Sequence, residues 1–270
     1  MTERLGRADL HIHTFASDGT SPVDDVLASA VATGLDVIAI TDHERIDAAV
    51  AGRAMAIDLG LPIEVVVGEE VTTLGGHLLA LFIEQRVAPF RSLRSTIAAI
   101  HDAGGLAIPA HPLVPYPLCA QGFALRRLIG DDDPIVHPDG LETFNPTMLG
   151  RPWHGRVVDF AAEHGLAAVG NSDAHSASEI GRGHSTYAGR SAADLRRAIE
   201  ARTTHAHGAF HGTSNQVGIF GRQLRKYGRD VRDEVAGRVR RDGTGRDHGY
   251  PGGRQRPPAY APARTTEPGR

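Results

Sequence analysis

Short apolar runs alternate with stretches of helical periodicity along the first two hundred or so residues of the chain. Seven runs predict strands, at residues 8–13, 35–41, 62–68, 77–83, 106–110, 140–144 and 167–170. Helical patterns lie between several of them, at about residues 21–34, 47–59, 92–103 and 153–164. This alternation is typical of βα units around a parallel sheet. Seven strands favour a closed, TIM-like α/β barrel over an open sheet.

The first predicted helix carries clear terminal signals. Ser21 stands at the N-cap position, Pro22 at the first helical position and Asp24 where a capping box would place an acid. Gly34 is a typical C-terminal stop.

Beyond residue 215 the pattern changes. Apolar residues recur at helical spacing among arginines, which predicts a short basic amphipathic helix: Leu224, Tyr227, Val231, Val235 and Val239. The chain after Arg241 is rich in glycine, proline and arginine, a composition typical of disorder. We therefore predict a barrel over residues 1–215 and a partly disordered basic tail over residues 216–270.

Charge is unevenly divided between these two parts. Residues 216–270 hold 13 basic and 6 acidic residues, and residues 1–215 hold 16 basic and 26 acidic ones. An acidic body is a poor partner for long nucleic acids, so nucleic acid is expected to bind only through the tail, if at all. The single cysteine, Cys119, excludes an intramolecular disulfide, and no run is long and apolar enough to span a membrane. The expected location is the cytoplasm, with no membrane association.

Candidate chemistry begins with His11 and His13. Two residues apart on a strand, they leave the same face about 7 Å apart, and two neutral imidazoles can bind one metal ion. Alone, this pair fits a structural or surface role better than a metal site. The pattern recurs, however, where other predicted strands begin or end, with Asp18, His43, Glu69 and Glu70, His77, His111, and Asp173 with His175. Because the carboxyl ends of barrel strands meet at one mouth, we expect a metal cluster there.

These motifs resemble those of the PHP (polymerase and histidinol phosphatase) family. The resemblance rests on Asp9-Leu10-His11-Ile12-His13-Thr14, Ser17-Asp18-Gly19, Ile40-Thr41-Asp42-His43, Ala110-His111-Pro112 and Ser172-Asp173-Ala174-His175, which follow one another in order over roughly residues 8–205. It implies a distorted (βα)7 barrel that binds two or three divalent ions, usually zinc, manganese or iron.

Carried over by position, the resemblance implies three metal sites. The first consists of His11, His13, Glu70 and Asp173; the second of Glu70 as a bridge, His77 and His111; the third of Asp18, His43 and His175. Glu70 fits the family pattern better than Glu69, and strand alternation lets only one of the two point inward easily. Asp18 stands where some members have histidine, which bears on the affinity for a third ion.

The implied activity is hydrolysis of a small phosphomonoester, such as a sugar, amino-alcohol or nucleotide phosphate. Acceleration of this reaction reaches about 10²¹-fold, far more than the roughly 10²–10⁴-fold of one acid–base pair. Clustered metal ions lower the pKa of water and neutralise phosphate oxygens, so we expect attack by a metal-bridging hydroxide. Asp173 and His175 would act in catalysis. Arg182 would grip the substrate phosphate or be an ordinary surface residue.

Two further polar groups have open roles in the sequence. Asp42 either orients a ligand histidine or caps the next helix. Glu142 and Asn145 end a strand that faces the mouth, which suggests a minor polar role.

Three other functions compete with the phosphatase. Many amidohydrolase barrels also begin with His-x-His but bridge two ions with a carbamylated lysine, and the only lysine here is Lys226, in the tail. A phosphodiesterase or exonuclease acting on dinucleotides or short nucleic acid is disfavoured by the acidic body and by an aromatic content of 5%. A non-catalytic metal-binding regulatory module that uses the basic tail is the third.

Overall fold

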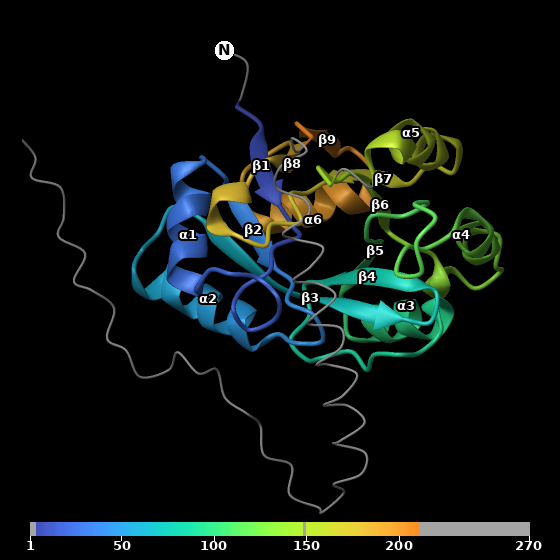
Figure 1. Cartoon of the computed structure of the whole chain (residues 1–270), viewed down its shortest axis with the longest axis horizontal. Coiled ribbons are helices and arrows are strands. Elements are labelled where there is room, and N and C mark those ends of the chain that lie inside the picture. The colour runs from blue at the N-terminus through green and yellow to red at the C-terminus, as the bar shows by residue number, and fades with distance from the viewer. Residues whose placement is uncertain (1–3, 148–149, 211–270) are drawn as a thin grey trace, which may run out of the picture.

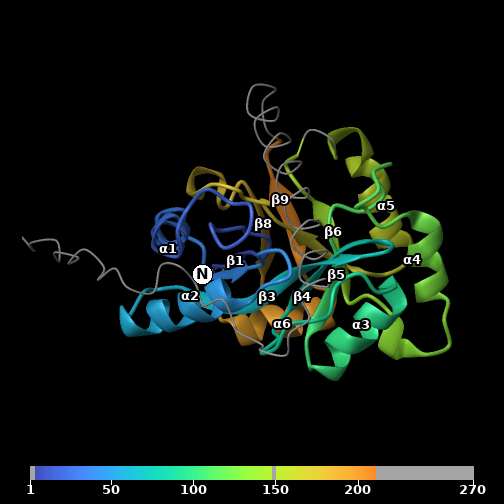
Figure 2. The same cartoon turned by 60° about the horizontal axis from the view of Figure 1, so that its bottom comes forward.

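Nine strands form two sheets in the described part of the chain, residues 4–147 and 150–210 of a computed structural model. The larger sheet follows the order β5 (Leu106–Pro109), β4 (Gly76–Leu81), β3 (Glu64–Thr73), β2 (Val37–Ile40), β1 (Gly6–Asp9), β8 (Gly183–Tyr187) and β9 (His205–Gly208). The smaller sheet pairs β6 (Gly140–Phe144) with β7 (Ala167–Gly170). Together the sheets curl into a half-barrel (Figures 1 and 2).

The strand directions confirm an α/β fold but not the closed, all-parallel (βα)7 barrel. Strands β1, β2 and β3 are parallel, as are β6 and β7. The pairs β3–β4, β4–β5, β1–β8 and β8–β9 are antiparallel. Only Leu74 and Gly75 join β3 to β4, and parallel strands need a crossover of a dozen or more residues. A hairpin is therefore the only connection possible there.

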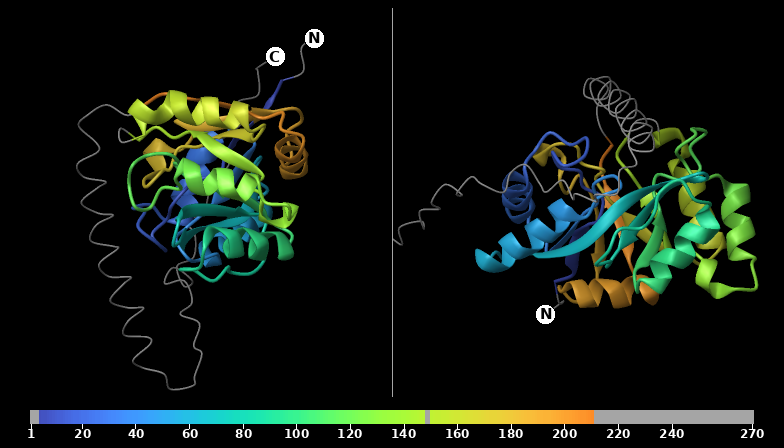
Figure 3. Two further views of the ribbon diagram at one scale, coloured as in Figure 1. Left: turned by 90° about the vertical axis from the view of Figure 1, so that its right-hand side faces the viewer. Right: turned by 90° about the horizontal axis from the view of Figure 1, so that it is seen from below.

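Six α-helices surround the sheets in the described residues: α1 (Val23–Ala32), α2 (Asp47–Asp58), α3 (Leu93–Asp102), α4 (Gly122–Ile129), α5 (His154–Glu163) and α6 (Ala192–Glu200). The helical patterns of the sequence predict α1, α2, α3 and α5, whereas α4, α6, β8 and β9 were not predicted. Figure 1 shows α1 and α2 on one flank and α3, α4 and α5 on the other. Figure 3 shows α6 beneath the sheets.

The strand β2 illustrates how the core is divided. Its side chains alternate between faces, and all four residues are buried. Val37 and Ala39 belong to an apolar cluster that includes Leu195 of α6, whereas Ile38 and Ile40 belong to one shared with α1 and α2. A third cluster joins β4 and β5 to α3, α4 and α5. With both faces packed, the strand ends that carry the polar motifs are held rigidly.

Helix α1 begins one residue later than its signals predict. Pro22 is the N-cap, and no side chain caps the helix. The Ser21 hydroxyl instead accepts a hydrogen bond from the Ala177 amide, 2.9 Å away, and so ties the helix start to the loop after β7. At the other end Gly34 adopts φ +70°, the left-handed conformation expected of a helix stop.

The predicted tail, residues 216–270, and its boundary with the barrel lie outside the described residues. None of the helices in the described ranges combines the length and apolar character that a membrane crossing requires.

Candidate metal centre

The nine side chains predicted to bind metal gather at one end of the half-barrel. His11, His13 and Asp18 follow β1, His43 follows β2, Glu70 lies in β3, His77 in β4, His111 follows β5, and Asp173 and His175 follow β7. His77 lies near the start of β4, which is antiparallel to β3. Because the turn between the two strands follows the end of β3, the start of β4 lies at the same end of the half-barrel as the other residues. The prediction that these residues meet at one mouth is therefore confirmed, while their role as ligands stays a prediction.

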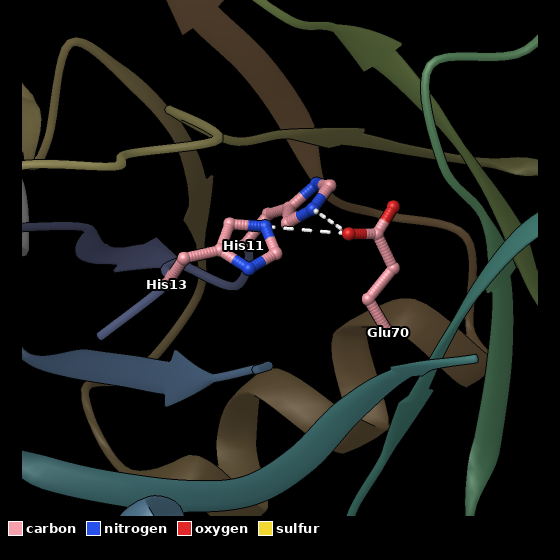
Figure 4. Close-up of side chains that lie close together, drawn as sticks. All are labelled: His11, His13 and Glu70. Atoms are coloured by element: carbon pink, nitrogen blue, oxygen red, sulfur yellow. Dashed lines mark ion pairs between the residues drawn. The ribbon is translucent and has the colours of Figure 1, made fainter. Parts of the chain in front are cut away.

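Glu70 lies at the centre of the group and faces five imidazoles. Its Oε2 is 3.1 Å from His11 Nε2, 3.3 Å from His13 Nε2 and 3.4 Å from His43 Nε2. Its Oε1 is 2.7 Å from His77 Nδ1 and 3.1 Å from His111 Nε2. Figure 4 shows His11 and His13 pointing at the same carboxylate oxygen. Each oxygen thus serves a different set of histidines, which is the arrangement that a bridging ligand requires.

Asp173 and Asp18 supply the other carboxylates. Asp173 Oδ1 lies 3.4 Å from Nε2 of both His11 and His13. Asp18 Oδ2 lies 3.1 Å from His175 Nε2 and 3.8 Å from His43 Nε2. The second Asp18 oxygen, Oδ1, is 3.4 Å from His13 Nδ1, so this one carboxylate joins the predicted third site to the first.

The donor atoms fit divalent transition-metal ions. Nε2 of His11, Nε2 of His13 and Nδ1 of His77 are buried without a hydrogen-bond partner among the described residues. Carboxylate oxygens approach these nitrogens closely, but at angles that make no hydrogen bond. Triplets such as His11, His13 and Glu70 keep their ligand atoms within 4.8 Å of one another, close enough to share an ion. Imidazole nitrogens with carboxylate oxygens suit zinc, manganese or iron better than calcium.

The electrostatics of the cluster favour charge on both kinds of group. Burial alone would raise the pKa of Glu70, but the surrounding imidazoles, His77 foremost, hold it well below its usual range. Burial alone would lower the pKa of His13, but the Asp18 carboxylate, together with the nearby Asp173 and Glu70 carboxylates, raises it to about 10. A metal-free cluster therefore holds protons that a binding ion must displace.

Glu142 of β6 has a larger role than the sequence suggests. It is buried, and its Oε1 accepts hydrogen bonds from His11 Nδ1 at 2.9 Å and from Asn171 Nδ2 at 2.9 Å. Its Oε2 accepts from the His111 amide at 2.6 Å and from Asn145 Nδ2 at 3.0 Å. The Asn145 amide also lies 3.2 Å from Asp173 Oδ2. A buried carboxylate at an inward position of a strand was the sequence signal for this role.

Asp42 holds the segment that follows β1. Its Oδ1 accepts from the Thr14 amide at 2.7 Å, and its Oδ2 accepts from the Thr14 hydroxyl at 2.7 Å. The Ser17 hydroxyl donates to Oδ1 at 2.5 Å and also lies 3.4 Å from His13 Nδ1. Asp42 thus anchors the loop that carries Asp18 and is linked to His13 through Ser17, while its role in orienting a ligand histidine stays a prediction.

Two other residues near the cluster face in different directions. Glu69 points away from it, as strand alternation predicts, and its Oε1 accepts a hydrogen bond from the Val87 amide at 2.5 Å. Cys119, whose only use in the sequence analysis is to exclude a disulfide, lies with its Sγ 3.4 Å from His111 Nδ1.

Arg182 begins the chain segment that enters β8. Its guanidinium is exposed, and Nη1 lies 3.5 Å from the Phe210 carbonyl oxygen. Its role in gripping phosphate stays a prediction.

Comparison with protein-family models places two matches on the chain. The model described as the PHP domain matches residues 9–111, and the one described as PHP-associated matches residues 151–204. Both matches include segments that carry cluster residues or follow them directly.

Three individual proteins are also similar to this chain. An uncharacterized protein of Methanocaldococcus jannaschii is 33% identical over 150 residues, which cover 52% of this chain and 81% of that protein. An error-prone DNA polymerase of Symbiobacterium thermophilum is 35% identical over 95 residues, 34% of this chain but only 8% of the polymerase. Among solved structures, a two-domain protein of Bacteroides vulgatus containing a predicted PHP-like metal-dependent phosphoesterase has a TM-score of 0.63 at 20% identity, over 83% of this chain and 70% of that one.

Proposed function

The chain belongs to the PHP domain family, and from that membership we propose that it is a metal-dependent phosphoesterase that hydrolyses a small phosphomonoester. The observation that carries the proposal is Glu70, whose two oxygens each face a separate set of imidazoles. A carboxylate in this position can join two ions at the spacing that phosphate hydrolysis requires. The cytoplasm remains the expected location.

The residues divide into three proposed sets of ligands. His11, His13, Glu70 and Asp173 would hold a first ion; Glu70, His77 and His111 a second; Asp18, His43 and His175 a third. Bound zinc, manganese or iron ions would supply an activated water and neutralise the phosphate oxygens. The chain keeps the donors in place through burial: His11 and His13 are at most 1% exposed.

The protein's own groups have further proposed tasks. Asp173 and His175 follow β7 and lie within the cluster, Asp173 beside His11 and His13 and His175 beside Asp18, where they can orient the group under attack. Arg182 is placed after the same loop and is the arginine we propose to bind the substrate phosphate, because a guanidinium can form paired hydrogen bonds with phosphate oxygens. The chain has no lysine before residue 226 that could take this task instead.

Turnover of p-nitrophenyl phosphate by the full chain tests the activity. We expect hydrolysis that is lost with a chelator and restored by manganese, zinc or iron added singly, followed by a panel of sugar, amino-alcohol and nucleotide monophosphates. Absence of turnover with every metal, despite bound ions, would favour the non-catalytic module.

The similarity to part of a DNA polymerase favours one alternative, a phosphodiesterase or exonuclease. Faster turnover of bis-p-nitrophenyl phosphate or of a short oligonucleotide than of any monoester would replace the phosphatase with this function. Binding of the same oligonucleotide before and after truncation at residue 212 would show whether the basic tail takes part.

A further inference from the structure

Two of the proposed ligand histidines are oriented by partners of very different strength. His11 directs Nε2 toward Glu70 and places Nδ1 2.9 Å from a carboxylate oxygen of Glu142. His111 likewise directs Nε2 toward Glu70 but places Nδ1 3.4 Å from the Cys119 sulfur. The two imidazoles thus face opposite oxygens of one carboxylate in similar ways, and they differ in what lies behind them.

The partner behind His11 is fixed in place. Glu142 is 2% exposed, and four groups donate to its two oxygens: His11 Nδ1, Asn171 Nδ2, Asn145 Nδ2 and the His111 amide. An ionised carboxylate with every acceptor position filled has one orientation. It forces the His11 proton onto Nδ1, leaves the Nε2 lone pair for an ion and makes that nitrogen a stronger donor.

The partner behind His111 is weaker. A thiol sulfur is a poor hydrogen-bond acceptor, and 3.4 Å is a long contact. The loop that carries Cys119 is nevertheless held firmly: the Leu113 amide donates to the Ala120 carbonyl, and the His77 amide donates to the Leu118 carbonyl, both at 2.9 Å. The weak contact is therefore a property of the sulfur and not of a misplaced loop.

Carboxylates are also unevenly shared between the two sites. The first set has Glu70 and Asp173 as ligands, and the Nδ1 atom of His13 faces Asp18. The second set has only Glu70, and no carboxylate lies behind His111 among the described residues.

We propose that Glu142 and Cys119 are positioning residues that give the two bridged sites unequal metal affinities, with a tightly held first ion and a weakly held second ion. This inference rests on the metal centre of the proposed function and adds the order in which its sites fill. Loss of an orienting partner of a ligand histidine typically costs 10–100-fold in metal affinity, so a thiol in place of a carboxylate is expected to separate the two sites by about tenfold or more.

Substitution Glu142→Gln reaches the first site selectively. The His111 backbone amide cannot turn around, so the one oxygen of the glutamine stays with it and with Asn145. The glutamine NH₂ then faces His11 Nδ1, which must give up its proton to accept from that group. The proton moves to Nε2 and removes the lone pair that faces the ion.

The test is a titration of the chelator-stripped full chain with Zn²⁺. Calorimetry against a competing chelator measures the affinities, and ¹⁵N NMR of the imidazoles shows which histidines bind first. In the unmodified chain the two bridged sites should fill separately, as a tight class and a weak class, with His11 signals changing before those of His111. Glu142→Gln should weaken the tight class about 10–100-fold and move the His11 proton to Nε2, with the weak class within about threefold.

Cys119→Asp supplies a carboxylate behind His111 and should tighten the weak class about tenfold, whereas Cys119→Ser, the matched control, should leave it within about threefold. Equal affinities in the unmodified chain, or a tight class untouched by Glu142→Gln, would overturn the inference. If Glu142→Gln does not fold, the order of the NMR changes in the unmodified chain decides. Failure to bind Zn²⁺ at all would instead refute the proposed function.

Discussion

Substitution Glu70→Gln removes the charge at the centre of the cluster with almost no change in shape. The five imidazole nitrogens that surround this carboxylate lie 2.7–3.4 Å from its oxygens. At about 3.2 Å and an effective dielectric constant of about 20, one unit charge interacts with another by roughly 5 kcal/mol, more than a thousandfold in affinity. A divalent ion loses at least this much attraction. We therefore expect both proposed bridged ions to leave and the turnover of p-nitrophenyl phosphate to fall at least about a thousandfold.

The neighbouring Glu69 provides a matched control for this substitution. It lies on the same strand, is fully buried and faces the Val87 amide instead of the cluster. Metal content measured by mass spectrometry and turnover of p-nitrophenyl phosphate should both be lost in Glu70→Gln and kept in Glu69→Gln. A Glu70→Gln protein that kept its metal content and its turnover within threefold would show that the carboxylate is not a bridge.

Three further predictions use other groups. Burial raises the pKa of Glu69 from an ordinary 4.5 to about 7, so the folded state binds this proton more tightly than the unfolded state does. The protein should therefore lose up to about 3 kcal/mol of stability as pH rises from 4.5 to 7. Urea unfolding at pH 5 and pH 8 should show that Glu69→Gln removes this loss. Asp18, Asp173 and Glu70 raise the pKa of His13 to about 10, so a binding ion must displace a proton below that pH. Zn²⁺ affinity, measured with an indicator dye, should therefore rise between pH 6.5 and 10 by about tenfold per pH unit for each proton displaced. A flat pH profile would contradict this. Asp42→Asn should loosen the loop that carries Asp18 and lower the affinity for a third ion about 10–100-fold, while the two bridged ions stay bound. Stepwise calorimetry would detect this difference. An equal loss of affinity for all ions would contradict it.

Much of the centre is predictable because its residues occur in short local motifs. The extended backbone just after β1 places His11 beside His13, and the end of β2 places His43, so residue type and position suffice to predict a cluster of candidate metal ligands. The hairpin of β3 and β4 was missed for a local reason as well. The sequence prediction ended the third strand at residue 68, whereas β3 continues to Thr73, which leaves room only for a two-residue turn.

The remainder of the centre depends on contacts between distant parts of the chain. Glu142 is 131 residues from His11, and Asp42 is 28 residues from the Thr14 amide that it binds. No periodicity or spacing brings these atoms together; the packing of both faces of the sheets does so. This division separates two properties of the site. Its candidate ligand types, and hence the proposed class of ion, follow from local sequence, whereas the proton positions of the candidate ligand histidines follow from the tertiary fold. Two chains with identical ligand motifs can therefore differ in metal affinity by the 10–100-fold that an orienting partner supplies, and substitutions far from any motif can retune the site.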